Sequence, residues 1–127
     1  MRLVLDTNIL ISALFWDGNE RKLLRLCRKE KHQLIISPQI LDELSRVLLD
    51  KFNLPAEKIT EYREEILLMS ELTLPIGDVD IIKDDPTDNV ILETAVIGKA
   101  DRIITGDKHL LRLKKFEKTK ITKSIDL

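Results

Sequence analysis

Cysteine and histidine are scarce in this chain of 127 residues, which contains one Cys and two His. A single cysteine, Cys27, excludes a disulfide framework within the chain. With so few thiols and imidazoles, the sequence lacks the clustered ligands that a zinc site uses. No serine or cysteine with a paired histidine stands out as a nucleophile. We therefore expect any metal chemistry in this chain to depend on oxygen ligands.

Long apolar runs are also missing. No segment approaches the ~18 consecutive apolar residues that a membrane-spanning helix needs. Asp6 interrupts the first apolar run, so the N-terminal stretch is not typical of a targeting segment. No internal repeat, low-complexity tract or interdomain linker is apparent. The length and the 43% hydrophobic content predict one domain over residues 1–127, with a real core and a cytoplasmic location.

The charge is unevenly distributed along the chain. Residues 99–127, here called the basic lobe, carry nine Lys/Arg against four Asp/Glu, which is a net charge of +5. Residues 1–98 have a net charge of −6. A basic patch of this kind can hold a polyanion, although a solvated lysine-rich surface is the commoner explanation. The candidate contacts for a polyanion are Lys108, Arg112, Lys114, Lys115 and Lys118.

Residues 3–13 read LVLDTNILISA and organise the rest of the chain. The apolar run at residues 3–5 has no polar alternation, which predicts a strand buried on both faces of a parallel sheet. Asp6 ends this strand, and Asn8 or Asp6 can cap the helix that follows. Ligands of open α/β sheets gather outside the carboxyl ends of the strands. Asp6 is therefore either an ordinary cap or a functional group.

The following segments alternate helices with short strands. Glu43 lies at the edge of an apolar helical stripe, three residues after Ile40 and four before Val47, whereas Asp42 points elsewhere. A glutamate in this position either extends to water or serves the nearby strand ends. Helices are predicted at residues 20–31, from 38 to about 49 and at 56–70, and two more are predicted to begin at Pro86 and at Lys108. Strands are predicted at 33–36, 72–76, 102–105 and 118–122.

A second informative stretch, residues 84–106, reads DDPTDNVILETAVIGKADRIITG. Asp85 can cap a helix that begins at Pro86, and Asp88 then falls in the first turn, where an acidic residue is favourable by itself. However, Asp88 also shares a face with Ile91 and Leu92, at the end of a buried stripe. A charge that points toward a core needs a partner. Asp107 follows the next strand and repeats the arrangement of Asp6.

This alternation, with right-handed crossovers, predicts a mainly parallel sheet of about four to five strands between helix layers. Asp6, Glu43, Asp88 and Asp107 all follow strands or begin helices at one edge of it. Four converging carboxylates would repel one another and raise one another's pKa unless a cation neutralised them. Hard oxygen ligands suit Mg²⁺ or Mn²⁺. One or two such ions can activate water against a phosphodiester, which is nuclease chemistry.

Four segments, in this order and spacing, resemble PIN-domain proteins of the kind found as ribonuclease toxins in bacterial and archaeal toxin-antitoxin pairs. They are LVLDTNILISAL, the Glu43 helix, DPTDNVILETA and RIITGDKHLL, and together they cover nearly the whole chain. The resemblance implies a three-layer α/β PIN-like fold and cleavage of single-stranded RNA by Mg²⁺- or Mn²⁺-activated water. It also implies a small antitoxin partner and a possible homodimer. The site residues implied are the acids Asp6, Glu43, Asp88 and Asp107, which bind the metal and carry the catalysis, with Asn8 and Thr105 as supports.

Some alternatives stay open at the level of sequence. Glu43 is the acid least fixed by a motif, so Glu93, Asp84 or Asp85 could contribute instead. A PIN fold that serves only as a silent binding or assembly module is the competing function, although such a module would be expected to lack one of the acids. A receiver or phosphatase-like domain is disfavoured, because those folds usually place a second acid beside the first-strand aspartate or two residues after it.

Overall fold

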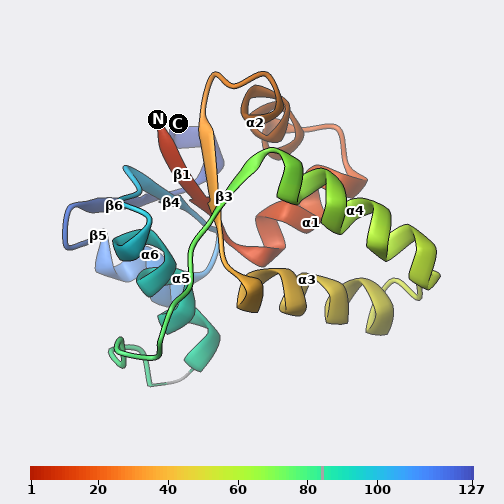
Figure 1. The fold of residues 1–127 in the computed structure, drawn as a ribbon. Coiled ribbons are helices and arrows are strands. Elements are labelled where there is room, and N and C mark those ends of the chain that lie inside the picture. The colour runs from red at the N-terminus through yellow and green to blue at the C-terminus, as the bar shows by residue number, and fades with distance from the viewer. Residues whose placement is uncertain (84) are drawn as a thin grey trace.

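The computed structural model describes residues 1–83 and 85–127, and it shows a six-stranded sheet with helices on both faces (Figure 1). Its strands are β1 (Arg2–Leu5), β2 (Gln33–Ile36), β3 (Ser70–Leu72), β4 (Arg102–Ile104), β5 (Lys115–Phe116) and β6 (Thr119–Thr122). The order across the sheet is β3-β2-β1-β4-β6-β5. Neighbouring strands are parallel except β5 and β6, which form an antiparallel hairpin. The predicted α/β class with a mainly parallel central sheet is confirmed.

Helices follow the strands in the predicted alternation. They are α1 (Thr7–Phe15), α2 (Asn19–Arg28), α3 (Pro38–Asp50), α4 (Ala56–Leu68), α5 (Pro86–Ile97) and α6 (Lys108–Leu113), with a short 3₁₀ turn, η1 (Ser124–Asp126). Helix α5 packs on β1, β2 and β4, and α6 packs on β6. Within the described ranges, no helix has the length and apolar character needed to cross a membrane.

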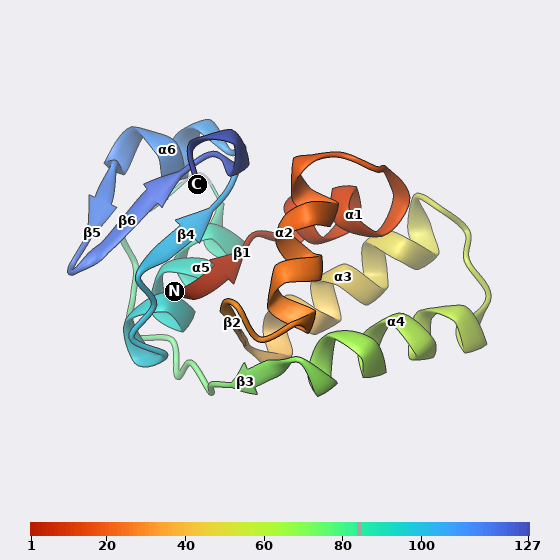
Figure 2. The same cartoon turned by 90° about the horizontal axis from the view of Figure 1, so that it is seen from above.

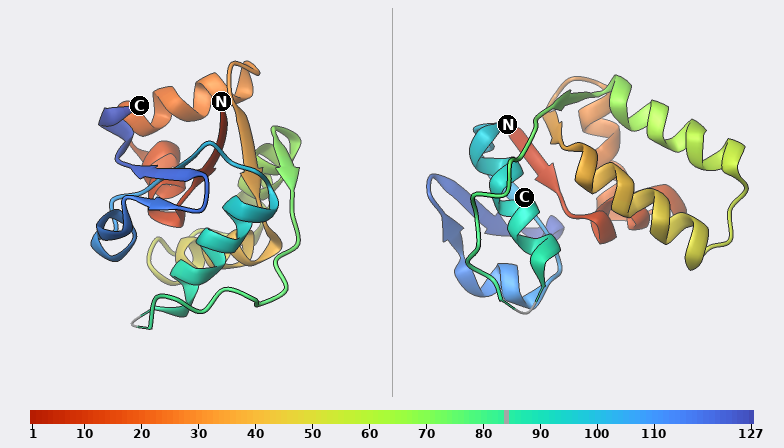
Figure 3. Two further views of the ribbon diagram at one scale, coloured as in Figure 1. Left: turned by 90° about the vertical axis from the view of Figure 1, so that its left-hand side faces the viewer. Right: turned by 60° about the horizontal axis from the view of Figure 1, so that its bottom comes forward.

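The strand order explains where the helices lie. From β1 to β2 to β3 the chain moves toward one edge of the sheet, and from β3 to β4 to β6 it moves back toward the other. Right-handed connections then place α1 and α2 on one face and α5 on the opposite face, as Figures 2 and 3 show. The direction of travel switches between the neighbouring strands β1 and β4. A crevice at the carboxyl ends of such a strand pair is the usual ligand site of open α/β sheets.

The core is built from the strand residues that the sequence marks as apolar. Leu3, Val4 and Leu5 of β1 are at most 1% exposed, so this strand is buried on both faces. Its backbone pairs with β2 on one side and β4 on the other. Because β1 is fixed on every side, the residue that follows it, Asp6, has a well-defined position.

Several element boundaries differ from the sequence predictions; the helix predicted at residues 20–31, for example, ends at Arg28. The strand predicted at residues 72–76 is wrong in place: β3 ends at Leu72, since its partner β2 ends at Ile36 and Thr73 makes the last amide bond to that strand. The helix predicted to reach residue 70 ends at Leu68, and β3 begins two residues later. The sheet also has one strand more than the expected four to five, because β5 forms a short hairpin with β6.

Candidate metal centre

Asp6 follows β1 and is held in one orientation by two hydrogen bonds. Its Oδ1 accepts the N–H of Thr7 at 2.7 Å, and its Oδ2 accepts the hydroxyl of Thr105 at 2.7 Å. Burial raises the pKa of Asp6, the bonds from Thr105 and Thr7 lower it, and the charges of Glu43 and Asp107 raise it again, so the net shift is upward. The side chain is thus fixed beside other carboxylates in a place that disfavours its charge.

The structure decides which residue caps α1. Asp6 is the N-cap, with extended backbone and its carboxylate on the N–H of Thr7, so the suggestion that Asn8 caps this helix is wrong. Asn8 instead lies inside the first turn with an exposed side chain. The reason is chain geometry, since α1 begins at Thr7, directly after Asp6, and leaves no room for a later cap. Asn8 therefore faces solvent near Asp6.

Glu43 on α3 points toward Asp6, and Asp42 does not. The Glu43 carboxylate is half-buried and accepts the hydroxyl of Thr7 at 3.1 Å. Asp42 is exposed and pairs with Arg63 at 3.3 Å. The helical position of Glu43, at the border of the buried stripe, thus directs it to the carboxyl end of β1.

Asp107 follows β4, the strand next to β1, and its charge acts on Asp6. Its Oδ1 accepts the N–H groups of His109 and Leu110 at 2.7 and 3.2 Å, which caps α6. Its own N–H donates to Oγ1 of Thr105 at 2.9 Å. Thr105 therefore donates to Asp6 and accepts from Asp107, and its fully buried side chain links the two acids.

Asp88 has the smallest exposed fraction of the four acids. It is 4% exposed, and its Oδ2 has no hydrogen-bond partner in the part of the chain that the structure describes. Burial raises the pKa of Asp88 to about 7, assisted by the charges of Asp107, Asp85, Asp6 and Glu43, in that order. A buried carboxylate oxygen without a donor is costly. Asp88 therefore needs either a proton or a cation.

A divalent cation fits these residues. One carboxylate oxygen each from Asp85, Asp88 and Asp107 lies within 4.8 Å of the other two. Carboxylate oxygens are the ligands that Mg²⁺ and Mn²⁺ prefer. A cation there would give the buried Asp88 carboxylate a partner and offset the mutual repulsion that contributes to the raised pKa values of Asp6 and Asp88.

Two of the acids that the sequence offered as alternatives, Asp85 and Glu93, lie in different places. Asp85 caps α5, where its Oδ1 accepts the N–H and hydroxyl of Thr87 at 3.0 and 2.6 Å, and it lies next to Asp88. The Glu93 carboxylate accepts backbone N–H groups of Ile76, Gly77 and Val79, so it holds the loop after β3 and does not join the acids. Asp84 lies outside the described residues.

The contacts of Glu93 with this loop were not predicted from the sequence. Burial acts to raise the pKa of Glu93, but the loop N–H donors outweigh it and hold the pKa below its usual value. Asn89, one turn earlier on α5, accepts the N–H groups of Ile81 and Ile82 at 2.9 Å. In the sequence, these loop contacts are indicated by two polar residues, four positions apart, within an otherwise apolar helix. Together they fix the loop that leads to Asp85.

Known proteins share this arrangement of strands and helices. A family model for the PIN domain matches residues 2–109. The chain belongs to the PIN-domain family. Four chains of solved structures match as well, among them one in the crystal structure of VapBC2 from Rickettsia felis bound to a DNA fragment from their promoter. It is 20% identical, with a TM-score of 0.66, over 95% of this chain and 97% of that one, which shows a shared fold. No curated protein matches.

In this PIN domain, the cationic candidates of the basic lobe follow Asp107 in the chain. Asp107 caps α6, and the five candidate contacts sit on that helix, at its end and on the β5–β6 hairpin. All five are exposed: Lys108, Arg112, Lys114, Lys115 and Lys118. Cationic side chains thus follow within a few residues of a site that is rich in negative charge.

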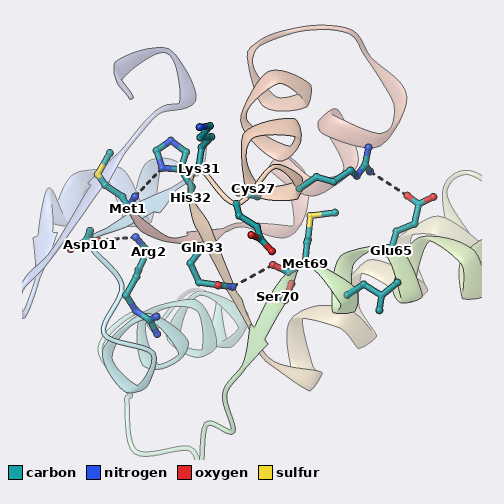
Figure 4. Close-up of a pocket in the computed structure, with 13 residues that line it drawn as sticks. Met1, Arg2, Cys27, Lys31, His32, Gln33, Glu65, Met69, Ser70 and Asp101 are labelled. Carbon is teal, nitrogen blue, oxygen red and sulfur yellow. Dashed lines mark hydrogen bonds and ion pairs between the residues drawn. The ribbon is translucent and has the colours of Figure 1, made fainter.

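A cavity of about 750 Å³ lies elsewhere in this PIN domain, at the amino ends of the strands. It is lined by residues such as Arg2, Gln33 and Ser70 (Figure 4). Its walls carry paired groups, including the N-terminal amine with Nδ1 of His32 at 2.9 Å. None of the described acids of the candidate site lines it. Cavity size therefore does not identify the metal centre, which is a cluster at the opposite end of the parallel strands.

Proposed function

We propose that this PIN domain is a Mg²⁺- or Mn²⁺-dependent endoribonuclease that cleaves single-stranded RNA. The observation that carries the proposal is the convergence of Asp6, Glu43, Asp88 and Asp107 at the switch point, with Oδ2 of Asp88 buried and unpartnered among the described residues. Clustered carboxylates with a buried, unpartnered oxygen do not stabilise the folded chain. Binding of a cation would make the arrangement favourable.

In this proposal the four acids hold the cation. When bound, a divalent ion supplies an activated water and offsets the charge that develops on a phosphodiester. The chain's own contribution is preorganisation: Thr7 and Thr105 fix both oxygens of Asp6, and the Thr7 hydroxyl fixes Glu43. Asn8, exposed on the first turn of α1, is a polar support next to Asp6. Thr105 is a positioning residue, since it acts through the acids.

In this proposal the basic lobe contributes to RNA binding next to the acids. A site of several carboxylates repels the phosphates of RNA, so productive binding requires positive charge close by. Lys108, Arg112 and the lysines of the β5–β6 hairpin supply that charge on segments that follow Asp107. Contacts of this kind bind phosphate without reading sequence. In this proposal they hold the single strand across the acids.

We propose that this chain is the toxin of a toxin-antitoxin pair. The support is the shared fold with a chain of the VapBC2 structure, which was solved with a DNA fragment from the promoter. The proposed partner is a small antitoxin protein, and the proposed setting is the cytoplasm. Exposed apolar residues near β3, among them Leu68 at 89%, Leu74 at 64% and Ile76 at 78%, support a homodimer. Sedimentation of the purified chain tests that assembly.

A catalytically silent PIN module is the competing function. The presence of all four acids, each oriented or buried at one place, favours the enzyme. The deciding experiment is incubation of the purified chain, free of companion proteins, with single-stranded RNA in Mg²⁺, Mn²⁺ or EDTA. Cleavage in either metal that stops in EDTA supports the nuclease. Intact RNA in both metals supports the silent module.

A further inference from the structure

Residues 76–82, here called the clamped loop, run beside α5 in both views of Figure 3. At the start of this loop, the Glu93 carboxylate of α5 accepts the N–H groups of Ile76, Gly77 and Val79. Glu93 is only 4% exposed. A buried carboxylate is costly unless donors surround it, so the loop and the charge of Glu93 depend on each other.

Asn89 of α5 holds the other end of the clamped loop. Its Oδ1 accepts the N–H groups of Ile81 and Ile82 at 2.9 Å, and its Nδ2 donates to the carbonyl of Ile82 at 2.7 Å. The side chains of Asn89 and Ile82 are both buried. Ile82 lies three positions before Asp85, the N-cap of α5. Asn89 thus ties the first turn of α5 to the loop that precedes it.

Asp88 depends on the placement of its helix in a way that the other acids do not. Asp6 and Glu43 accept threonine hydroxyls, and Asp107 accepts two N–H groups. In the part of the chain that the structure describes, Oδ2 of Asp88 has no donor. Its place among the acids is therefore set by the backbone of α5, in the turn that also carries Asn89.

The apolar face of α5 does not by itself fix that placement. Ile91, Leu92 and Ala95 are at most 1% exposed, and their burial stabilises the helix on the sheet. Burial of apolar surface is non-directional, whereas hydrogen bonds require defined distances and angles. The bonds of Glu93 and Asn89 therefore supply the directional contacts between α5 and the clamped loop.

We propose that Glu93 and Asn89 are positioning residues of the acidic site, because they fix α5 against the clamped loop and thereby hold Asp88 among the other acids. This inference rests on the proposed function, since it concerns the same site. Neither residue binds the cation in this proposal. Residues that orient metal ligands without binding the ion commonly contribute about 10–100-fold to metal affinity.

Hydrogen exchange and Mn²⁺ binding test this inference without RNA. Glu93→Ala removes both acceptor oxygens, whereas Glu93→Gln removes the charge and keeps one acceptor. In the metal-free chain, the amides of Ile76, Gly77 and Val79 should exchange about tenfold faster in the alanine variant than in the wild type. Free Mn²⁺, measured by electron paramagnetic resonance, should show a Kd about tenfold higher for the alanine variant. Glu93→Gln should recover part of both losses, and it separates the hydrogen bonds from the charge.

Thr119→Val is the matched control. The buried Thr119 hydroxyl donates to the carbonyl of Ala100 at 2.8 Å, at the amino ends of the strands. Its loss should lower the melting temperature and leave the Mn²⁺ affinity unchanged. If Glu93→Ala does not fold, Asn89→Ala releases the other end of the clamped loop while Glu93 stays in place, and the same measurements apply.

Folded Glu93→Ala or Asn89→Ala chains that bind Mn²⁺ as tightly as the wild type would overturn the inference. An equal loss of affinity in Thr119→Val, or a wild type that binds no Mn²⁺, would overturn it as well. The proposed function fails separately. A wild type that binds Mn²⁺, is weakened by Glu93→Ala and cuts no RNA keeps the positioning role and loses the nuclease. A wild type that cuts RNA, with Mn²⁺ affinity unchanged in Glu93→Ala, does the reverse.

Discussion

The hydroxyl of Thr105 lies 2.7 Å from Oδ2 of Asp6, although the two residues are 99 positions apart in the chain. The contact exists because β1 and β4 are neighbouring parallel strands that end at the same edge of the sheet. Thr105 also accepts the N–H of Asp107 at 2.9 Å. One buried hydroxyl therefore orders the acids that follow both strands.

Replacement of Thr105 by valine removes the hydroxyl while nearly keeping the volume of the side chain. Oδ2 of Asp6 then loses its donor, and the N–H of Asp107 loses its acceptor, in a place that is fully buried. We expect a loss of about 1–3 kcal/mol in the free energy of unfolding, measured in urea, together with weaker Mn²⁺ binding. Thr105→Ser, which keeps the hydroxyl, is the control and should retain most of the metal affinity. Equal affinity in the valine variant and the wild type would refute the link.

The metal-free protein should lose stability as pH rises from about 4 to about 7. The pKa of Asp88 is about 7 in the folded chain, whereas an unfolded aspartate has a pKa of about 3.9. Between these values the folded state binds more protons than the unfolded state, so unfolding becomes easier as pH increases. Asp88→Asn cannot titrate there and should flatten this dependence. Melting temperatures in EDTA from pH 4 to pH 8 check the slope, and equal slopes for both proteins would contradict it.

Divalent metal should reverse that instability. A ligand that binds only the folded state at 100 times its Kd adds about 2.7 kcal/mol to stability, so millimolar Mn²⁺ should raise the melting temperature by several degrees. Asp6→Asn should lose most of this response. Its metal-free form should be as stable as the wild type or more so, because one repelling charge is gone. A wild-type melting curve that does not move with Mn²⁺ would count heavily against the metal site.

The basic lobe should govern RNA affinity without sequence preference. Replacement of Lys114, Lys115 and Lys118 by glutamine should weaken binding to many single-stranded RNAs alike. The slope of log K against log salt should become shallower by about 0.7 for each phosphate that the variant no longer neutralises. The matched control replaces Lys22, Lys29 and Lys31, three lysines outside the lobe. Fluorescence anisotropy at several salt concentrations measures both effects, and unchanged affinity at low salt would show that the lobe is only a solvated surface.

Much of the acid arrangement could be predicted from sequence, because it follows from periodicity and strand direction. Asp6 and Asp107 come soon after apolar strands, and parallel strands end at one edge, so their proximity is a consequence of the sheet. Glu43 and Asp42 are adjacent, and the apolar stripe of α3 alone separates the inward residue from the outward one. The cap of α1 is not decidable in this way, since Asp6 and Asn8 are both good capping residues.

The features that escape sequence-based prediction depend on contacts between distant segments. The β5–β6 hairpin turns through Glu117 at a φ of 54°, a conformation for which glycine or asparagine is the usual signal. The charge of Glu93 is visible in the sequence and makes it a candidate acid, while the loop N–H groups that it accepts are not visible there. Asp85 has an evident cap position, and its closeness to Asp107 depends on how α5 and α6 pack.

The most direct test of the central claim is cleavage of single-stranded RNA by single-residue variants in Mn²⁺. Wild type and Asp42→Asn should cut, since Asp42 is exposed and paired with Arg63. Asp6→Asn, Asp88→Asn and Asp107→Asn should each lose nearly all activity while remaining folded by circular dichroism. Residues that act as a unit lose about as much singly as together. EDTA should reduce the wild type to the same level. If the triple Asn variant cuts RNA as well as the wild type, the acids are not the catalytic site and the proposed nuclease mechanism is wrong.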